Sequence, residues 1–126
     1  MVFLATLFAA VSLGLAQPPS LGVACPNAGN MTTCGRIGIS ITLQRPALGA
    51  NAELVGKNVR LHQGGFAGRG PRVWEGYIHI DRHRLGLPTW WDGSRPVRYL
   101  VLHLRIHYAT HTAEGAVRVQ LRPGWG

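Results

Sequence analysis

One segment near the C-terminus constrains the fold more than any other part of this sequence: residues 97 to 108, which read VRYLVLHLRIHY. Its even positions from Leu100 to Ile106 are all aliphatic, whereas its odd positions become polar toward the end. A side-chain period of two is typical of a strand with one buried face. A helix would need apolar residues three and four positions apart, and this segment does not provide them. We therefore predict the central strand of an antiparallel sheet.

The same alternation predicts further strands. They are residues 36 to 43 (RIGISITL), 72 to 81 (RVWEGYIHID) and 116 to 122 (AVRVQLR). Residues 51 to 55 and 58 to 62 flank Gly56-Lys57, which predicts a hairpin with glycine at the first turn position. Trp74 is expected to be the bulky side chain of the core. The last two strands are joined by a short polar connector and should form an antiparallel hairpin.

Some six or seven short strands separated by turn-forming residues predict an all-β fold, interpreted here as an antiparallel immunoglobulin-like β-sandwich. The resemblance is one of architecture only, because the two cysteines are too close in sequence to form an inter-sheet disulfide. The 126 residues suffice for one domain. The predicted organisation is a secretory signal segment (1–16), a disulfide-closed loop region (17–35) and the β-sandwich domain (36–126).

The N-terminus has the character of an export signal. Residues 1 to 16 form an uncharged apolar run, shorter than the roughly 20 residues that span a bilayer. The run ends in small residues, which predicts cleavage after Ala16, although no Lys or Arg precedes it. Residues 21 to 25 (LGVAC) also resemble a lipobox, which would place a lipid on Cys25. We expect a secreted, periplasmic or cell-envelope protein, attached to a membrane only through this segment or a lipidated Cys25.

The only two cysteines, Cys25 and Cys34, follow this apolar run. An even cysteine count after an export signal favours a disulfide bond. In the loop-entropy description such a bridge contributes roughly 2 to 3 kcal/mol.

The chain is strongly basic, with 13 Lys and Arg residues against 5 Asp and Glu residues and a net charge of +8. All of these cations except Lys57 are arginines, whose planar side chains bind carboxylate and phosphate groups in a bidentate manner. The charge indicates either a generally basic surface or attraction to a polyanion.

A candidate contact surface begins in the irregular stretch from residue 82 to residue 96. Adjacent Trp90 and Trp91 cannot both point inward in extended geometry, so one is expected to be exposed unless both rings cap the core. Exposed Trp beside charged residues is typical of sugar-stacking and protein-docking sites. The predicted contact residues are Trp90, Trp91, Asp92, Arg95, Arg98 and Arg105. Arg118 and Arg122 extend this surface along the last strand.

Six histidines are the main candidate metal ligands. His103 and His107 are four residues apart, which is about 13 Å along a strand, too far to share one ion. A zinc or copper site would have to be assembled across strands, for example from His79 with His103 or His107, and with Glu75 or Asp81 as an oxygen ligand. The alternative is that these histidines are solvated surface residues.

Enzyme classes receive no support from the sequence. It contains no G-x-S-x-G motif and no H-E-x-x-H motif, and five acidic residues leave little for acid–base catalysis. We therefore expect an exported, non-enzymatic domain that binds an envelope or extracellular protein, a glycan or an anionic polymer, and not nucleic acid. The alternative function is an exported metal-binding protein that uses cross-strand histidines.

Overall fold

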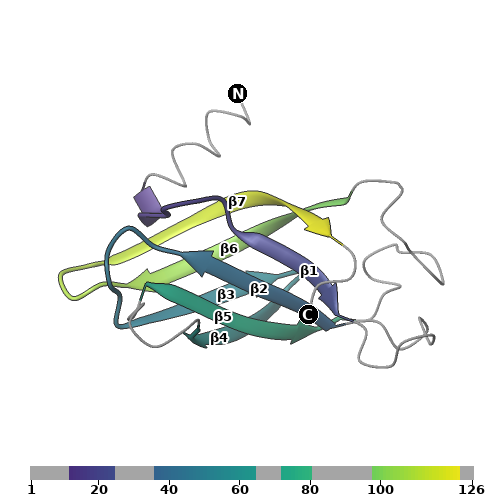
Figure 1. The fold of residues 1–126 in the computed structure, drawn as a ribbon, viewed down its shortest axis with the longest axis horizontal. Coiled ribbons are helices and arrows are strands. Elements are labelled where there is room, and N and C mark those ends of the chain that lie inside the picture. Colours follow the sequence, from purple (N-terminus) through teal and green to yellow (C-terminus); the bar gives the residue numbers. More distant parts are fainter. Residues whose placement is uncertain (1–11, 25–35, 65–71, 81–97, 123–126) are drawn as a thin grey trace.

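The computed structural model describes residues 12–24, 36–64, 72–80 and 98–122 of the chain. Seven strands make up this part of the molecule (Figure 1). They are β1 (Ser20–Ala24), β2 (Arg36–Thr42), β3 (Gly49–Leu54), β4 (Lys57–Gln63), β5 (Val73–His79), β6 (Arg98–His107) and β7 (Thr112–Arg122). The all-β class and the number of strands expected from the sequence are confirmed.

The seven strands form one closed barrel in the order β1-β2-β5-β4-β3-β6-β7. All neighbouring strands are antiparallel except β1 and β7, which are parallel. The pairing is uneven around the barrel: β6 and β7 pair over ten residues each, whereas β4 pairs with β5, and β1 with β7, over only two. The barrel therefore consists of two well-paired arcs, β1-β2-β5 and β4-β3-β6-β7, joined at two short seams.

This closure differs from the predicted sandwich, whose two sheets would have separate edges. The tight β3–β4 hairpin holds β4 beside β3, and the far end of β4 also pairs with β5 through His62 and Gln63. Strand β4 thus connects the two arcs at this seam. Alternating hydrophobicity reports which face of a strand is buried but not which strands lie beside it, so the sequence pattern could not distinguish a sandwich from a flattened barrel.

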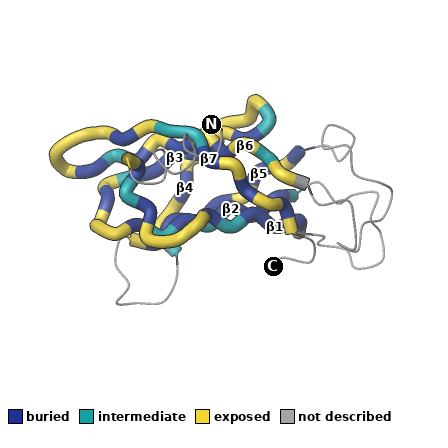
Figure 2. Tube along the Cα trace, turned by 90° about the horizontal axis from the view of Figure 1, so that it is seen from above, coloured by how far each residue is buried: buried dark blue, intermediate teal, exposed yellow. Residues whose placement is uncertain are grey.

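The core fills the inside of the barrel, and buried and exposed residues alternate along the strands (Figure 2). Every second residue of β6 from Leu102 to Ile106 is at most 2% exposed, as the sequence predicts. Trp74 is also buried, and no polar or charged residue in the described ranges is. Full burial of an aliphatic side chain contributes about 1.5 to 3 kcal/mol. Side-chain burial in an entirely apolar interior therefore supplies the main stabilisation of the barrel.

The predicted hairpin is confirmed, but its turn lies one residue earlier than expected. Leu54 pairs with Lys57, so the two turn residues are Val55 and Gly56, with φ angles of 49° and 78°. Positive φ at both positions defines the turn whose twist matches that of the flanking strands. Gly56 adopts this conformation freely, whereas a β-branched residue such as Val55 does so only under strain.

The N-terminal segment takes part in the barrel. Strand β1 lies within the region predicted to be a loop, so sequence reasoning missed it. Before β1, Leu15 pairs with Leu43 of the chain after β2, and the Ala16 N–H donates to the Thr42 carbonyl at 2.8 Å. Leu13 and Leu15 belong to the buried core. Both precede the expected cleavage point after Ala16, and that cleavage stays a prediction.

Two further expectations concern the disulfide bond and attachment to a membrane. Cys25 and Cys34 lie outside those ranges, so their disulfide stays a prediction. In the part of the chain that the structure describes, no helix is long and apolar enough to cross a membrane.

Candidate binding surface

The outer face of β6 and β7 carries an exposed patch of aromatic, aliphatic and basic side chains. Tyr99 and Val101 are each 50% exposed, because they occupy the odd, outward positions of β6. The Arg118 guanidinium of β7 lies 4.5 Å from the centroid of the Tyr99 ring. Such a cation–π contact at an exposed site contributes about 0.5 to 1 kcal/mol and holds both groups in place.

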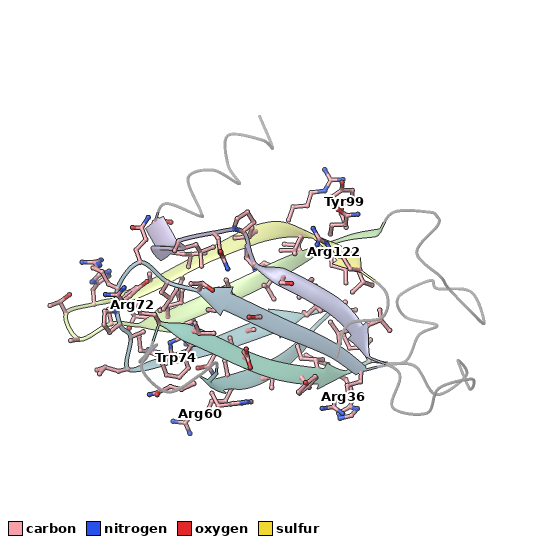
Figure 3. All side chains as sticks on the ribbon, viewed as in Figure 1. Arg36, Arg60, Arg72, Trp74, Tyr99 and Arg122 are labelled. Carbon is pink, nitrogen blue, oxygen red and sulfur yellow. The ribbon has the colours of Figure 1, made fainter. Side chains whose placement is uncertain are left out.

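We call this surface the aromatic-basic patch. Its residues are Tyr99, Val101, Arg118, Gln120 and Arg122. The register places Tyr99 opposite Gln120 and Val101 opposite Arg118, so the patch is continuous across the two strands. Tyr99 and Arg122 project from the same end of the barrel (Figure 3).

A groove of about 690 Å³ adjoins this patch at the junction between β1 and β7. One wall is the N-terminal segment from Leu15 to Ser20, and the other is β7 from Val117 to Gln120 together with Arg122. The groove exists because β1 reaches β7 only at Leu121 and Arg122. Pro18 and Pro19 lack the backbone N–H that pairing requires, so the chain before β1 does not continue the ladder. We call this feature the seam groove.

The lining of the seam groove is apolar at its base and basic at its rim. Leu15, Val117 and Val119 are buried side chains that form part of the lining. Arg118 and Arg122 supply the charge, and no acidic residue lines the groove. The groove and the aromatic-basic patch share both arginines, so they form one continuous surface.

A second groove, of about 550 Å³, crosses the outer face of β3, β6 and β7. It is polar, and both signs of charge occur in it. The Arg105 Nε forms an ion pair with Glu114 Oε1, although both side chains are more than half exposed, so the pair contributes little to stability. His107 Nδ1 lies 3.3 Å from the hydroxyl oxygen of Thr112. The acidic and basic side chains of this groove largely balance each other, so the groove is a weaker candidate for binding an anion.

The structure divides the contact residues that the sequence predicts. Trp90, Trp91, Asp92 and Arg95 lie outside the described residues, so their exposure stays a prediction. Arg98 begins β6 and pairs with Leu121 of β7. Arg105 lies in the polar groove beside an acidic partner.

The histidines proposed as metal ligands do not come together. His79 of β5 pairs with Arg36 of β2, whereas His103 of β6 pairs with Glu53 of β3. Strands β4 and β3 lie between β5 and β6, and neighbouring strands are spaced about 4.8 Å apart. Among the described residues, no group of three or more His, Cys, Asp or Glu side chains is arranged to hold a metal ion.

Sequence reasoning missed two parts of the binding surface. Tyr99 and Val101 stood at outward positions of the strongest strand pattern, so their exposure could have been inferred from the alternation alone. The groove wall from Leu15 to Ser20 was harder to find, because an apolar run at an N-terminus is typical of an export signal as well as of a core segment.

A buried tyrosine fixes the N-terminal segment that forms this wall. The Tyr108 hydroxyl donates a hydrogen bond to the Leu13 carbonyl at 2.6 Å. Burial raises the pKa of the Tyr108 phenol above its ordinary value, and the nearby Arg45 guanidinium partly offsets this. Gly14 has a positive φ of 75°, and a Cβ atom there would lie 2.5 Å from the Tyr108 hydroxyl. Both features show that the segment is closely fitted to the end of β6.

Comparison of the chain with protein-family models, with curated proteins and with solved structures finds no match.

Proposed function

We propose that this chain is an exported, non-enzymatic domain that binds an anionic protein or polymer at the cell envelope or outside the cell. The observation that carries the proposal is the aromatic-basic patch, in which Arg118 is stacked on Tyr99 beside the half-exposed Val101. The export part rests on the N-terminal sequence, and the non-enzymatic part rests on the sequence motifs.

The chemistry of the patch supports contact with an anionic partner. Tyr and Arg are the residue types that dominate the energetics of protein interfaces. Stacking on Tyr99 restrains Arg118, which leaves less side-chain entropy to lose when a carboxylate or sulfate binds. The net charge of +8 would attract an anion over a longer range. Arg105 is less suited to this role because Glu114 already pairs with it.

We also propose that the barrel is a closed variant of the immunoglobulin-like arrangement. Taken in chain order as A to G, the strand orders β1-β2-β5-β4 and β3-β6-β7 correspond to A-B-E-D and C-F-G. The β1–β7 seam supports this view, because it is only two residue pairs long and lies where the open edges of strands A and G would meet in a sandwich. The fold by itself carries no function.

Reversing the charge of the patch tests the proposed function. In the double variant Arg118→Glu and Arg122→Glu, affinity for dextran sulfate should fall by about tenfold or more, because two attractive contacts become repulsive. Isothermal titration at low salt measures the change, and added salt should weaken wild-type binding through screening. Neutral dextran should not bind.

Arg60→Glu is the matched control. Arg60 is an exposed residue of β4, on the opposite side of the barrel from Tyr99 in Figure 3. This single reversal should change the affinity little. If Arg60→Glu weakened binding as much per charge as the patch variant, the attraction would be a property of the net charge and the patch would have no special role.

A further inference from the structure

One edge of β7 lacks a strand partner along most of its length. Strand β7 pairs with β6 from Thr112 to Leu121, but on its other edge it pairs with β1 only at Leu121 and Arg122. In the part of the chain that the structure describes, residues from Thr112 to Gln120 have no strand on that edge. The N–H and C=O groups of one residue point to one edge of a strand, and those of the next residue point to the other edge. Every second residue of β7 therefore directs a backbone donor and acceptor toward the seam groove.

The seam groove has the length and the lining that an added strand needs. The stretch from Val117 to Gln120 that lines it extends about 13 Å, the length of four residues of an extended chain. Side chains of an added strand would point alternately to its two faces. One set would meet the aliphatic base formed by Leu15 and Val119, and the other set would meet the basic rim at Arg118 and Arg122.

We propose that the seam groove binds an extended segment of a partner protein, in which acidic and small aliphatic residues alternate, as a strand added to β7. This inference rests on the proposed function and names the class of anionic partner as a peptide. Charge complementarity supports an acidic segment, since two arginines and no acidic residue line the groove. The unpaired backbone edge supports a peptide, because such edges recognise other chains through main-chain hydrogen bonds.

A second copy of this chain is a poorer occupant. Pairing of two β7 edges would bring Arg118 and Arg122 of one copy close to the same residues of the other. Each copy also carries a net charge of +8, so the approach would be opposed by like charges.

Backbone methylation of a probe peptide tests the proposal. The probe is a short fluorescein-labelled peptide in which Glu and Val alternate, and its binding to the full chain is followed by fluorescence anisotropy. Two modified peptides carry N-methyl groups either on every Glu or on every Val. An added strand directs only alternate N–H groups toward β7, so one modified peptide should lose about tenfold or more in affinity while the other binds like the unmodified probe.

Each other outcome overturns the inference in a distinguishable way. Equal binding of both methylated peptides would mean that charge alone holds the probe, which leaves the proposed function intact but removes strand addition. Binding of dextran sulfate without binding of the unmodified peptide would assign the surface to a polymer. Failure of both probes would remove the proposed function as well. A sedimenting dimer that the peptide does not dissociate would assign the groove to a second copy.

A pair of variants locates the binding. Arg118→Gln should weaken peptide binding by about fivefold or more, and Arg60→Gln should leave it unchanged. Circular dichroism checks that both variants fold. Equal weakening by the two variants would overturn the assignment to the seam groove.

Discussion

At the residue scale, Tyr108 joins parts of the chain that are distant in sequence. Its hydroxyl donates to the Leu13 carbonyl, 95 residues away, and the residue is only 8% exposed. The strand pattern correctly predicts the inward direction of the side chains of β6, because burial repeats every second residue. The Leu13 partner could not be predicted, since alternation carries no information about which distant group a buried hydroxyl meets.

Tyr108→Phe should lower the free energy of unfolding by about 1 kcal/mol near neutral pH, because the variant leaves the Leu13 carbonyl without its donor. The effect should depend on pH. The pKa of Tyr108 is raised in the folded state, so the unfolded chain loses this proton first as the pH rises above about 10. The stability gained from Tyr108 is therefore present below that pH and is lost as the pH rises through the raised pKa.

Urea unfolding of the wild type and the Phe variant between about pH 8 and about pH 11 measures this difference. The gap in unfolding free energy between the two proteins should narrow toward high pH. Profiles that stay parallel would contradict a raised pKa at this tyrosine.

At the element scale, the short junction between β4 and β5 is filled by side chains rather than by ladder bonds. A Cβ atom on Gly76 of β5 would lie 2.7 Å from Leu61 Cδ2 of β4. At the end of β5, Lys57 Nζ donates to the His79 carbonyl at 2.8 Å. The two strands thus stay together although they pair over only two residues.

Gly76→Ala should destabilise the fold by about 1 to 2 kcal/mol, because the added methyl group overlaps the Leu61 side chain in a filled interior. In a Leu61→Ala background the same change should cost much less, since the overlapping atom is absent. A double-mutant cycle of unfolding free energies measures the coupling. Additive costs would show that Leu61 does not fill the junction over Gly76.

The strands differ in how well the sequence predicts them. The strong period-two patterns from Arg36 to Thr42 and from Arg98 to His107 became strands with nearly the expected bounds. Strand β1 escaped prediction because its five residues, SLGVA, include a glycine and follow two prolines, so no alternation develops. Short strands are defined by the neighbours that they pair with, and those neighbours are not visible in the local sequence.

At the scale of the whole molecule, the N-terminal segment closes the core of the barrel. Leu13 is fully buried and Leu15 is 8% exposed, so both contribute to the apolar interior. The expected removal of residues 1 to 16 would take both side chains away. The proposed cleavage after Ala16 would therefore lower the stability of the barrel.

A chain that begins at Gln17 should be less stable than the full chain by several kcal/mol, because the loss of each buried leucine side chain costs about 2 to 5 kcal/mol. Thermal unfolding of the two forms, with Leu13→Ala in the full chain as an intermediate case, measures the effect. An unchanged midpoint after truncation would mean that the segment does not help to hold the barrel together.

The proposed binding surface has a charge that the sequence indicates and a shape that it does not. Arginines on the last strand and a basic net charge indicate either a generally basic surface or attraction to a polyanion. The seam groove depends on where β1 stops pairing with β7, and this is decided by how the barrel closes. The sequence before Cys25 contains no obvious strand, so it could not indicate that Leu15 to Ser20 form one wall of the groove.

The parallel pairing of β1 with β7 has a consequence for how this domain would be joined to others. The described chain enters the barrel at Leu13, beside the carboxyl end of β6, and leaves it at Arg122, beside the amino end of β6. These ends are separated by the length of a ten-residue strand, roughly 33 Å. A partner domain joined directly at Leu13 and another joined directly at Arg122 would therefore start from opposite ends of the barrel.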